Sequence, residues 1–197
     1  DHMWIDKKND GTYEKSDSSS IGNSPKLADA TFFFKGDFNE DSYKMRYTGN
    51  NSTSADEVTF AEEQIQDAPG DAGRLGEYGD CGVADATKGT DVKYKFTLKH
   101  KAAYLVLTPY SDYAFSSSVG IASVYVTADK PISGKFAFTD SGVGAPKAGA
   151  KNTIAWFYQE RLAGREYIST MSTMNRTNFL PIPQIASSYC RRARTTN

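Results

Sequence analysis

Apolar and polar residues alternate most clearly between residues 92 and 98, which read VKYKFTL. Every second residue is apolar there, and the residues between are two lysines and a threonine. A period of two is typical of a strand with one buried face. The pattern predicts that Tyr94, Phe96 and Leu98 face a core, while Lys93 and Lys95 face solvent.

Short apolar or aromatic runs that suit strands recur along much of the chain. The run over 102–108 is nearly continuous, which predicts a central strand covered on both faces. Several short strands at this spacing favour a β-sandwich over an alternation of helices and strands. The other runs that we interpret as strands are residues 30–34, 43–47, 57–60, 121–128 and 134–138.

The segments outside these runs have the composition of connections. Residues 1–28 are polar and rich in serine, and Asp1-His2-Met3 resembles vector-derived residues, so we expect a flexible leader with order beginning near residue 30. Residues 62–90 are rich in glycine and predict a long irregular loop. The chain thus divides into a leader over 1–28, a β-sandwich domain over 29–140, and a linker with a short or truncated C-terminal segment over 141–197.

The last segment fits no single period. Its linker character comes from Gly142, Gly144, Pro146 and Gly149. Residues 153–171 are compatible with a helix, which Gly164 would weaken. The sequence therefore assigns no structure to residues 141–197.

Composition and charge narrow the function classes. The 197 residues are 39% hydrophobic and 13% aromatic, enough for a packed core. The formal net charge of −1 gives no overall electrostatic case for nucleic acid or an anionic membrane as partner. The sequence has no run of roughly 20 apolar residues that would span a membrane.

The two cysteines, Cys81 and Cys190, are too few for a disulfide framework and wrongly spaced for zinc. Whether they pair or stay as thiols is left open. His100 is the one histidine outside the first three residues, and it lies within strand patterning. We interpret it as structural, since no nucleophile-elbow sequence accompanies it.

Asp37, Asn39 and Asp41 have the spacing that opens a calcium-binding loop. Ser42 stands where that loop needs glycine, and Thr48 stands where it needs glutamate. We therefore interpret the segment as an acidic turn. No catalytic, cofactor-binding or metal site is predicted, and we expect no enzymatic activity and no cofactor.

Residues 94–105, which read YKFTLKHKAAYL, resemble the hallmark strand segment of the fimbrillin-like proteins of Bacteroidales. Residues 121–126 and 132–136 resemble the strands that follow it in that family. The family includes subunits and anchors of type V pili (fimbriae). The resemblance implies a mainly β, transthyretin-like β-sandwich. It also implies export to the outer membrane or cell surface as a lipoprotein, held there by a lipid anchor.

Pilus subunits of this family are cut after an arginine, and the groove that opens accepts a strand from the next subunit. Arg46 is the first arginine of this chain and is therefore the candidate processing site. The implied function is that of a non-catalytic structural or adhesive protein. It would assemble with other pilus or surface subunits by β-strand addition. The chain departs from the family in having only about 50 residues after the linker, too few for a second sandwich.

Residues near the C-terminal end of the sequence indicate an alternative function. Residues 179–184, FLPIPQ, resemble a closing motif of glycan-capturing lipoproteins that partner outer-membrane transporters. On that interpretation the chain is a surface glycan-binding module of a polysaccharide-utilisation system, with a host protein or a glycan as partner. The aromatic platform that such a module needs would come from Tyr104, Tyr110, Tyr113, Phe115 and Tyr125.

Overall fold

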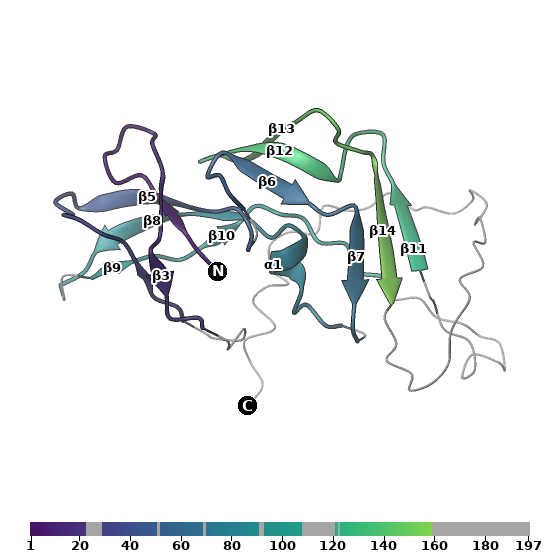
Figure 1. Ribbon diagram of the computed structural model, residues 1–197, viewed down its shortest axis with the longest axis horizontal. Coiled ribbons are helices and arrows are strands. Elements are labelled where there is room, and N and C mark those ends of the chain that lie inside the picture. The colour runs from purple at the N-terminus through teal and green to yellow at the C-terminus, as the bar shows by residue number, and fades with distance from the viewer. Residues whose placement is uncertain are drawn as a thin grey trace.

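The computed structural model describes residues 1–22, 29–50, 52–68, 70–90, 93–107, 121 and 123–158 of the chain. These residues form a mainly β structure with several antiparallel sheets and one single-turn helix, α1 (Leu75–Tyr78). The mainly β class predicted from the sequence is confirmed. Figure 1 shows the sheets arranged along the long axis of the molecule, with α1 near the middle.

The largest sheet has six strands and is antiparallel throughout. Its order is β10-β8-β5-β1-β2, and β9 pairs with the same side of β8 as β10 does. The register along that side is continuous, because Lys95 lies opposite Thr87 and Lys99 lies opposite Val83. The strands are β1 (Trp4–Ile5), β2 (Glu14–Lys15), β5 (Ser42–Tyr47), β8 (Gly82–Lys88), β9 (Tyr94–Lys95) and β10 (Lys99–His100).

Two three-stranded sheets and a short ribbon complete the described structure. One sheet is antiparallel and contains β6 (Glu57–Phe60), β12 (Gly134–Thr139) and β13 (Gly142–Pro146), in the order β13-β12-β6. The other contains β7 (Glu63–Gln66), β11 (Ser123–Thr127) and β14 (Thr153–Tyr158), in the order β11-β14-β7, with β14 parallel to β7. The ribbon pairs β3 (Ser18–Ser19) with β4 (Phe32–Phe33).

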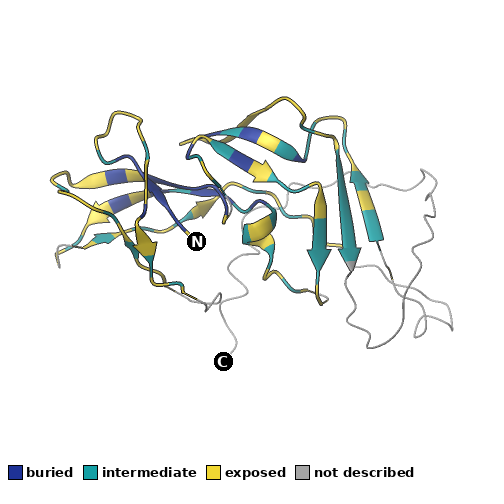
Figure 2. Cartoon of the chain, viewed as in Figure 1, coloured by how far each residue is buried: buried dark blue, intermediate teal, exposed yellow. Residues whose placement is uncertain are grey.

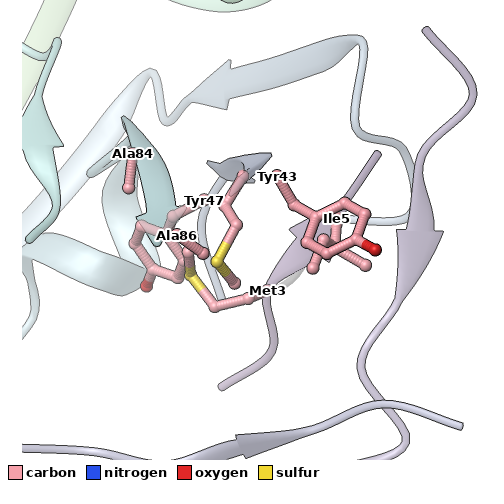
Figure 3. Packing of buried hydrophobic residues seen from close by; sticks show 7 residues of the cluster. Met3, Ile5, Tyr43, Tyr47, Ala84 and Ala86 are labelled. Carbon is pink, nitrogen blue, oxygen red and sulfur yellow. The ribbon is translucent and has the colours of Figure 1, made fainter. Parts of the chain in front are cut away.

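The main core lies on one face of the six-stranded sheet. Large side chains from β5 and those of Met3 and Ile5 pack there against the small side chains of Ala84 and Ala86 on β8 (Figure 3). Phe32, Phe34 and Phe96 cover this cluster from the ribbon side. A second cluster packs Val58 of β6 and Phe136 and Phe138 of β12 with Cys81, the residue before β8.

The prediction of a flexible leader over 1–28 is wrong for residues 1–22. Met3, Trp4 and Ile5 are all buried, and β1 lies between β5 and β2 inside the six-stranded sheet. His2 and Met3, interpreted as vector-derived, are likewise buried in the fold. Order therefore begins at the start of the chain, and not near residue 30.

Two further predicted connections are wrong as well. The expected loop over 62–90 contains β7, α1 and the central strand β8. The expected linker after residue 141 contains β13, which forms a hairpin with β12. Residues 153–158, part of the segment that the sequence leaves unassigned, form strand β14 and not the helix that was one possibility there. The sheets consequently cross both predicted domain boundaries, at 28/29 and at 140/141.

The strands predicted at 43–47, 57–60, 121–128 and 134–138 are confirmed as β5, β6, β11 and β12, with ends that agree within two residues. The strand predicted at 30–34 is present as β4. Within 92–98 the predicted facing is correct: Tyr94, Phe96 and Leu98 pack on the main core, while Lys93 and Lys95 are exposed. The prediction for 102–108 is wrong, because residues 102–107 form no strand and Leu105, Val106 and Leu107 are exposed.

Candidate functional site

The β7–β14–β11 sheet is the least covered part of the described fold. Its strands contain several large apolar residues, yet none of their described side chains is fully buried. Figure 2 shows the contrast with the six-stranded sheet, where dark blue buried residues run through the central strands. The apolar residues in question are Ile65, Val124, Tyr125, Val126, Ile154, Trp156 and Phe157.

Strand β11 is one edge of this sheet. It pairs with β14 on one side, from Ser123 opposite Phe157 to Thr127 opposite Thr153. In the part of the chain that the structure describes, no strand pairs with its other side. Its sequence, SVYVT, is uncharged and rich in β-branched and aromatic residues.

Strand β7 is the opposite edge of the same sheet and has a different character. Its four residues are Glu63, Gln64, Ile65 and Gln66. Charged and polar side chains on an edge strand disfavour the addition of another chain, and an apolar edge such as β11 has no such protection. The two edges therefore differ in what they can accept.

A second exposed apolar stretch lies at residues 105–107. Leu105, Val106 and Leu107 are 46%, 56% and 51% exposed, and Ile121 and Tyr125 are 44% and 56% exposed. Large apolar side chains that are exposed at consecutive positions suit a surface that another molecule covers. Together with the edge of β11, they are the described features best suited to binding a protein segment.

The start of this stretch is held by Asp80. The Asp80 carboxylate accepts hydrogen bonds at Oδ1 from the Tyr104 hydroxyl (2.5 Å) and lies 2.9 Å from Nδ1 of His100. Tyr104, predicted as part of an aromatic platform, is therefore half-buried and bonded to a carboxylate. His100 lies on edge strand β10 in an ion pair with Asp80, an arrangement that agrees with a structural role.

Cys81 is next in sequence to Asp80 but belongs to the second core cluster, where it is fully buried. Burial, with a smaller contribution from the Asp80 charge, raises the pKa of the Cys81 thiol to about 12. A thiol with so high a pKa is a poor nucleophile at neutral pH. Cys190, whose pairing with Cys81 the sequence leaves open, lies outside the described residues.

Arg46, the candidate processing site, is buried at 7% exposure in β5, between β1 and β8. Its guanidinium donates to Asp140 (2.8 Å), to Asp56 (2.5 Å) and to the carbonyl oxygen of Ala55 (3.2 Å). The ring of Tyr13 lies 3.9 Å from the guanidinium carbon. A protease that cuts after an arginine needs its extended backbone, and both sides of β5 are paired in this fold.

Asp140 is the centre of this cluster. It also accepts a hydrogen bond from the Tyr13 hydroxyl (2.5 Å) and one from Lys44 (3.0 Å). Burial alone would raise the pKa of Asp140, but the bonds from Tyr13, Lys44 and Arg46 outweigh it and lower that pKa to about 2. The cluster ties the β12–β13 turn to the six-stranded sheet, which is a structural role.

The residues with calcium-loop spacing surround a different feature. Asp37 and Asn39 line a pocket of about 340 Å³ together with Lys7, Lys8 and other residues. The backbone N–H groups of Asn39 and Glu40 donate to the Tyr43 hydroxyl, at 2.8 and 2.9 Å. The described residues contain no cluster of three or more metal-ligating side chains.

The sequence indicated only part of this picture. Tyr110, Tyr113 and Phe115 of the predicted platform lie outside the described residues, as does the 179–184 motif, so only Tyr104 and Tyr125 of that set are placed. The sequence did not predict the contacts of Asp80 with His100 and Tyr104, or the incompletely buried β7–β14–β11 sheet. Strand β14 carried a signal for the sheet, because TIAWFY is rich in β-branched and aromatic residues.

A comparison with known proteins found no match among family models, curated proteins or solved structures. Among the described residues, no helix is long and apolar enough to cross a membrane.

Proposed function

We propose that this chain is an exported, non-catalytic surface protein that assembles with further subunits by β-strand addition at β11. The observation that carries the proposal is the uncharged edge of β11, in a sheet whose described apolar residues are half-buried or, at Tyr125, exposed. An added strand gains backbone hydrogen bonds along its length, and its alternating side chains gain contacts with the exposed apolar residues.

We propose a transthyretin-like sandwich as the fold and the cell surface, with a lipid anchor, as the location. The fold is supported by the antiparallel pairing of the six-stranded sheet, by the core on one face of that sheet, and by the ribbon that packs on the same core. Residues 94–105, on which the fimbrillin-like resemblance rests, form the edge of that sheet and the exposed stretch after it.

The experiment uses proline at two adjacent positions of β11, Val124→Pro and Tyr125→Pro. Alternate residues of an antiparallel strand direct their N–H groups to opposite sides, so one of the two positions faces β14 and the other faces the open edge. We expect the variant at the open side to keep the wild-type melting temperature and to lose assembly. Assembly is measured as SDS-resistant ladders and by sedimentation of the full chain.

The matched control is the pair Gln64→Pro and Ile65→Pro on β7, the protected edge of the same sheet. The member of that pair that folds should still assemble. Assembly of a folded β11 variant at the wild-type level would overturn the proposal, as would a wild-type protein that stays monomeric at all concentrations tested.

A surface glycan-binding module is the second candidate, and one observation favours it. The Tyr125 ring is 56% exposed and meets Phe157 edge-to-face, with ring centroids 6.2 Å apart. An exposed aromatic ring of this kind can stack on a sugar. Retention of the monomeric chain on a glycan array, lost in Tyr125→Ala, would favour this function over assembly.

A further inference from the structure

A row of four lysines follows the edge of the six-stranded sheet. Lys93, Lys95, Lys99 and Lys101 are all exposed, and Thr97 occupies the position between the two pairs. The continuous register against β8 keeps these alternate residues on one face of the sheet, since residues two apart in a strand point the same way. The intervening Tyr94, Phe96 and Leu98 pack on the main core.

The spacing makes the row act as one charged surface. Neighbouring lysines in it are about 7 or 13 Å apart, and the whole row spans about 26 Å of extended chain. At 0.1 M salt the Debye length is about 10 Å, so each ammonium group lies within or close to the screening distance of the next. The potentials of the four groups therefore overlap along the edge.

These four lysines have no carboxylate partner among the described residues. Other lysines of the chain are paired, such as Lys135 and Lys147 with Glu57, and Lys151 with Glu62. The carboxylate in register on the same face is Asp85, opposite Thr97 and beside Lys44. Asp140 and Asp80 are already bonded to Arg46 and His100. Four positive charges thus face one negative charge.

We propose that this lysine row binds a linear anionic polysaccharide. Lysine offers point charges on flexible stems, and their repeat along the edge matches a ligand whose carboxylate or sulfate groups also repeat along a chain. Single-stranded nucleic acid is disfavoured as the ligand, because the aromatic residues of this edge face the core and offer no stacking platform for bases. This surface is separate from β11, so the proposal is independent of strand addition.

Lysines on an edge strand also discourage strand addition, and that role alone would need no ligand. The experiment separates the two. The full chain is passed over immobilised polygalacturonate, dextran sulfate and neutral dextran at about 50 mM salt, where screening is weak. We expect retention on the two anionic polymers, elution by added salt, and no retention on neutral dextran. The carboxylate and sulfate arms show which charged group is preferred.

The decisive variant is K93Q/K95Q/K99Q/K101Q, with K35Q/K135Q/K147Q/K151Q as a control that removes the same number of charges from ion-paired lysines. We expect the first to lower affinity by at least about tenfold and the second to change it by less than about twofold. Replacing the row with arginine should preserve binding. Melting temperatures establish that each variant is folded.

If the quadruple variant is unfolded, the double variants K93Q/K95Q and K99Q/K101Q take its place, each with an expected loss of about threefold. Equal losses in the row and control variants would overturn the proposal, since net charge alone would then explain binding. It would also be overturned if the wild type is not retained, or if it binds single-stranded DNA more tightly than both polysaccharides.

Discussion

Arg46 joins three parts of the chain through one guanidinium group. Arg46 lies in β5. It donates hydrogen bonds to Asp56, in the connection to β6, and to Asp140, in the β12–β13 turn. Its guanidinium also lies over the ring of Tyr13, in the β1–β2 hairpin. Its own side chain is 8% exposed, whereas those of Asp56 and Asp140 are 73% and 39% exposed. Water therefore screens part of each ion pair, and the bonds to buried carbonyl groups share the stabilisation.

Replacing Arg46 with alanine should lower the free energy of unfolding by about 3 kcal/mol, as measured by chemical denaturation. The loss combines two screened ion pairs, the bond to the Ala55 carbonyl and the contact with Tyr13. The comparison is Lys35→Ala, which breaks an exposed pair with Asp17 and should cost less than about 1 kcal/mol. Similar losses in both variants would contradict a central role for Arg46.

His2 illustrates a buried group without its full set of partners. Its Nε2 is buried and has no hydrogen-bond partner in the described structure, and its ring meets Trp4 edge-on at 5.4 Å. Burial first, and then the positive charges of Lys15 and the amino terminus, lower the pKa of His2 below its usual 6.5. The folded state therefore favours neutral His2.

The free energy of unfolding should consequently fall as the pH drops below about 6.5, where the unfolded chain binds a proton that the folded chain resists. Above that pH the contribution is fully present. In His2→Phe, which keeps an aromatic ring on Trp4, this part of the pH dependence should disappear. Denaturant titrations of both proteins between pH 7.5 and 5 test this. Parallel pH profiles would count against the prediction.

At the scale of an element, two separate features of the structure require glycine at position 134, at the start of β12. Its φ of +94° is one that residues with a side chain rarely adopt, and a Cβ there would lie 2.8 Å from the Cα of Ala150. Gly149 has a similar φ of +86° with no atom within 4 Å of its Cβ position. The two glycines lie on either side of the same hairpin, so they separate conformational strain from steric contact.

We expect Gly149→Ala to lower the free energy of unfolding by about 1 kcal/mol and Gly134→Ala to lower it by about 2–3 kcal/mol. The first value reflects the positive φ alone, and the difference reflects the collision with the backbone of residue 150. Thermal and chemical denaturation of both variants provide the measurement. Equal effects would mean that the backbone near Ala150 moves aside at little cost.

The sequence predicted strands well where the large residues themselves carry the period. Tyr94, Phe96 and Leu98 were placed correctly because each contributes a large buried ring or branched chain on one face. Strand β8 was missed because its core-facing residues are Ala84 and Ala86. Their small size complements Met3, Tyr43 and Met45, a relation that involves other strands and leaves almost no hydrophobic signal within β8 itself.

The run at residues 102–108 failed for the opposite reason. Its composition suits a buried strand, yet Leu105, Val106 and Leu107 are exposed. Sequence patterns report what a segment can pair with, and not whether the partner belongs to the same chain. The sequence therefore predicted the apolar segments of the candidate site as strands and did not predict that they are exposed. The contacts of Asp80 could not be predicted either, because their partners are 20 or more residues away in the sequence.

For the whole molecule, the first residues are part of the core and not an appendage. Deleting residues 1–6 removes β1, exposes one side of β5 and takes Met3 and Ile5 out of the main cluster. We expect the shortened chain to lack a cooperative unfolding transition and a dispersed NMR spectrum. In contrast, the volume-conserving change Met3→Leu should cost less than about 1.5 kcal/mol. Cooperative unfolding of the shortened chain would show that β1 is dispensable.

The place of β1 inside the sheet also sets an order of events during synthesis. Met3, Trp4 and Ile5 leave the ribosome before their partners on β5, and the sheet gains its central strand β8 only when residue 88 has emerged. At typical elongation rates of about 5–20 residues per second, that wait lasts roughly 4–17 s. Until then the large side chains of β1 and β5 lack Ala84 and Ala86, against which they pack in the finished core, so these apolar residues of the nascent chain are a natural target for chaperones.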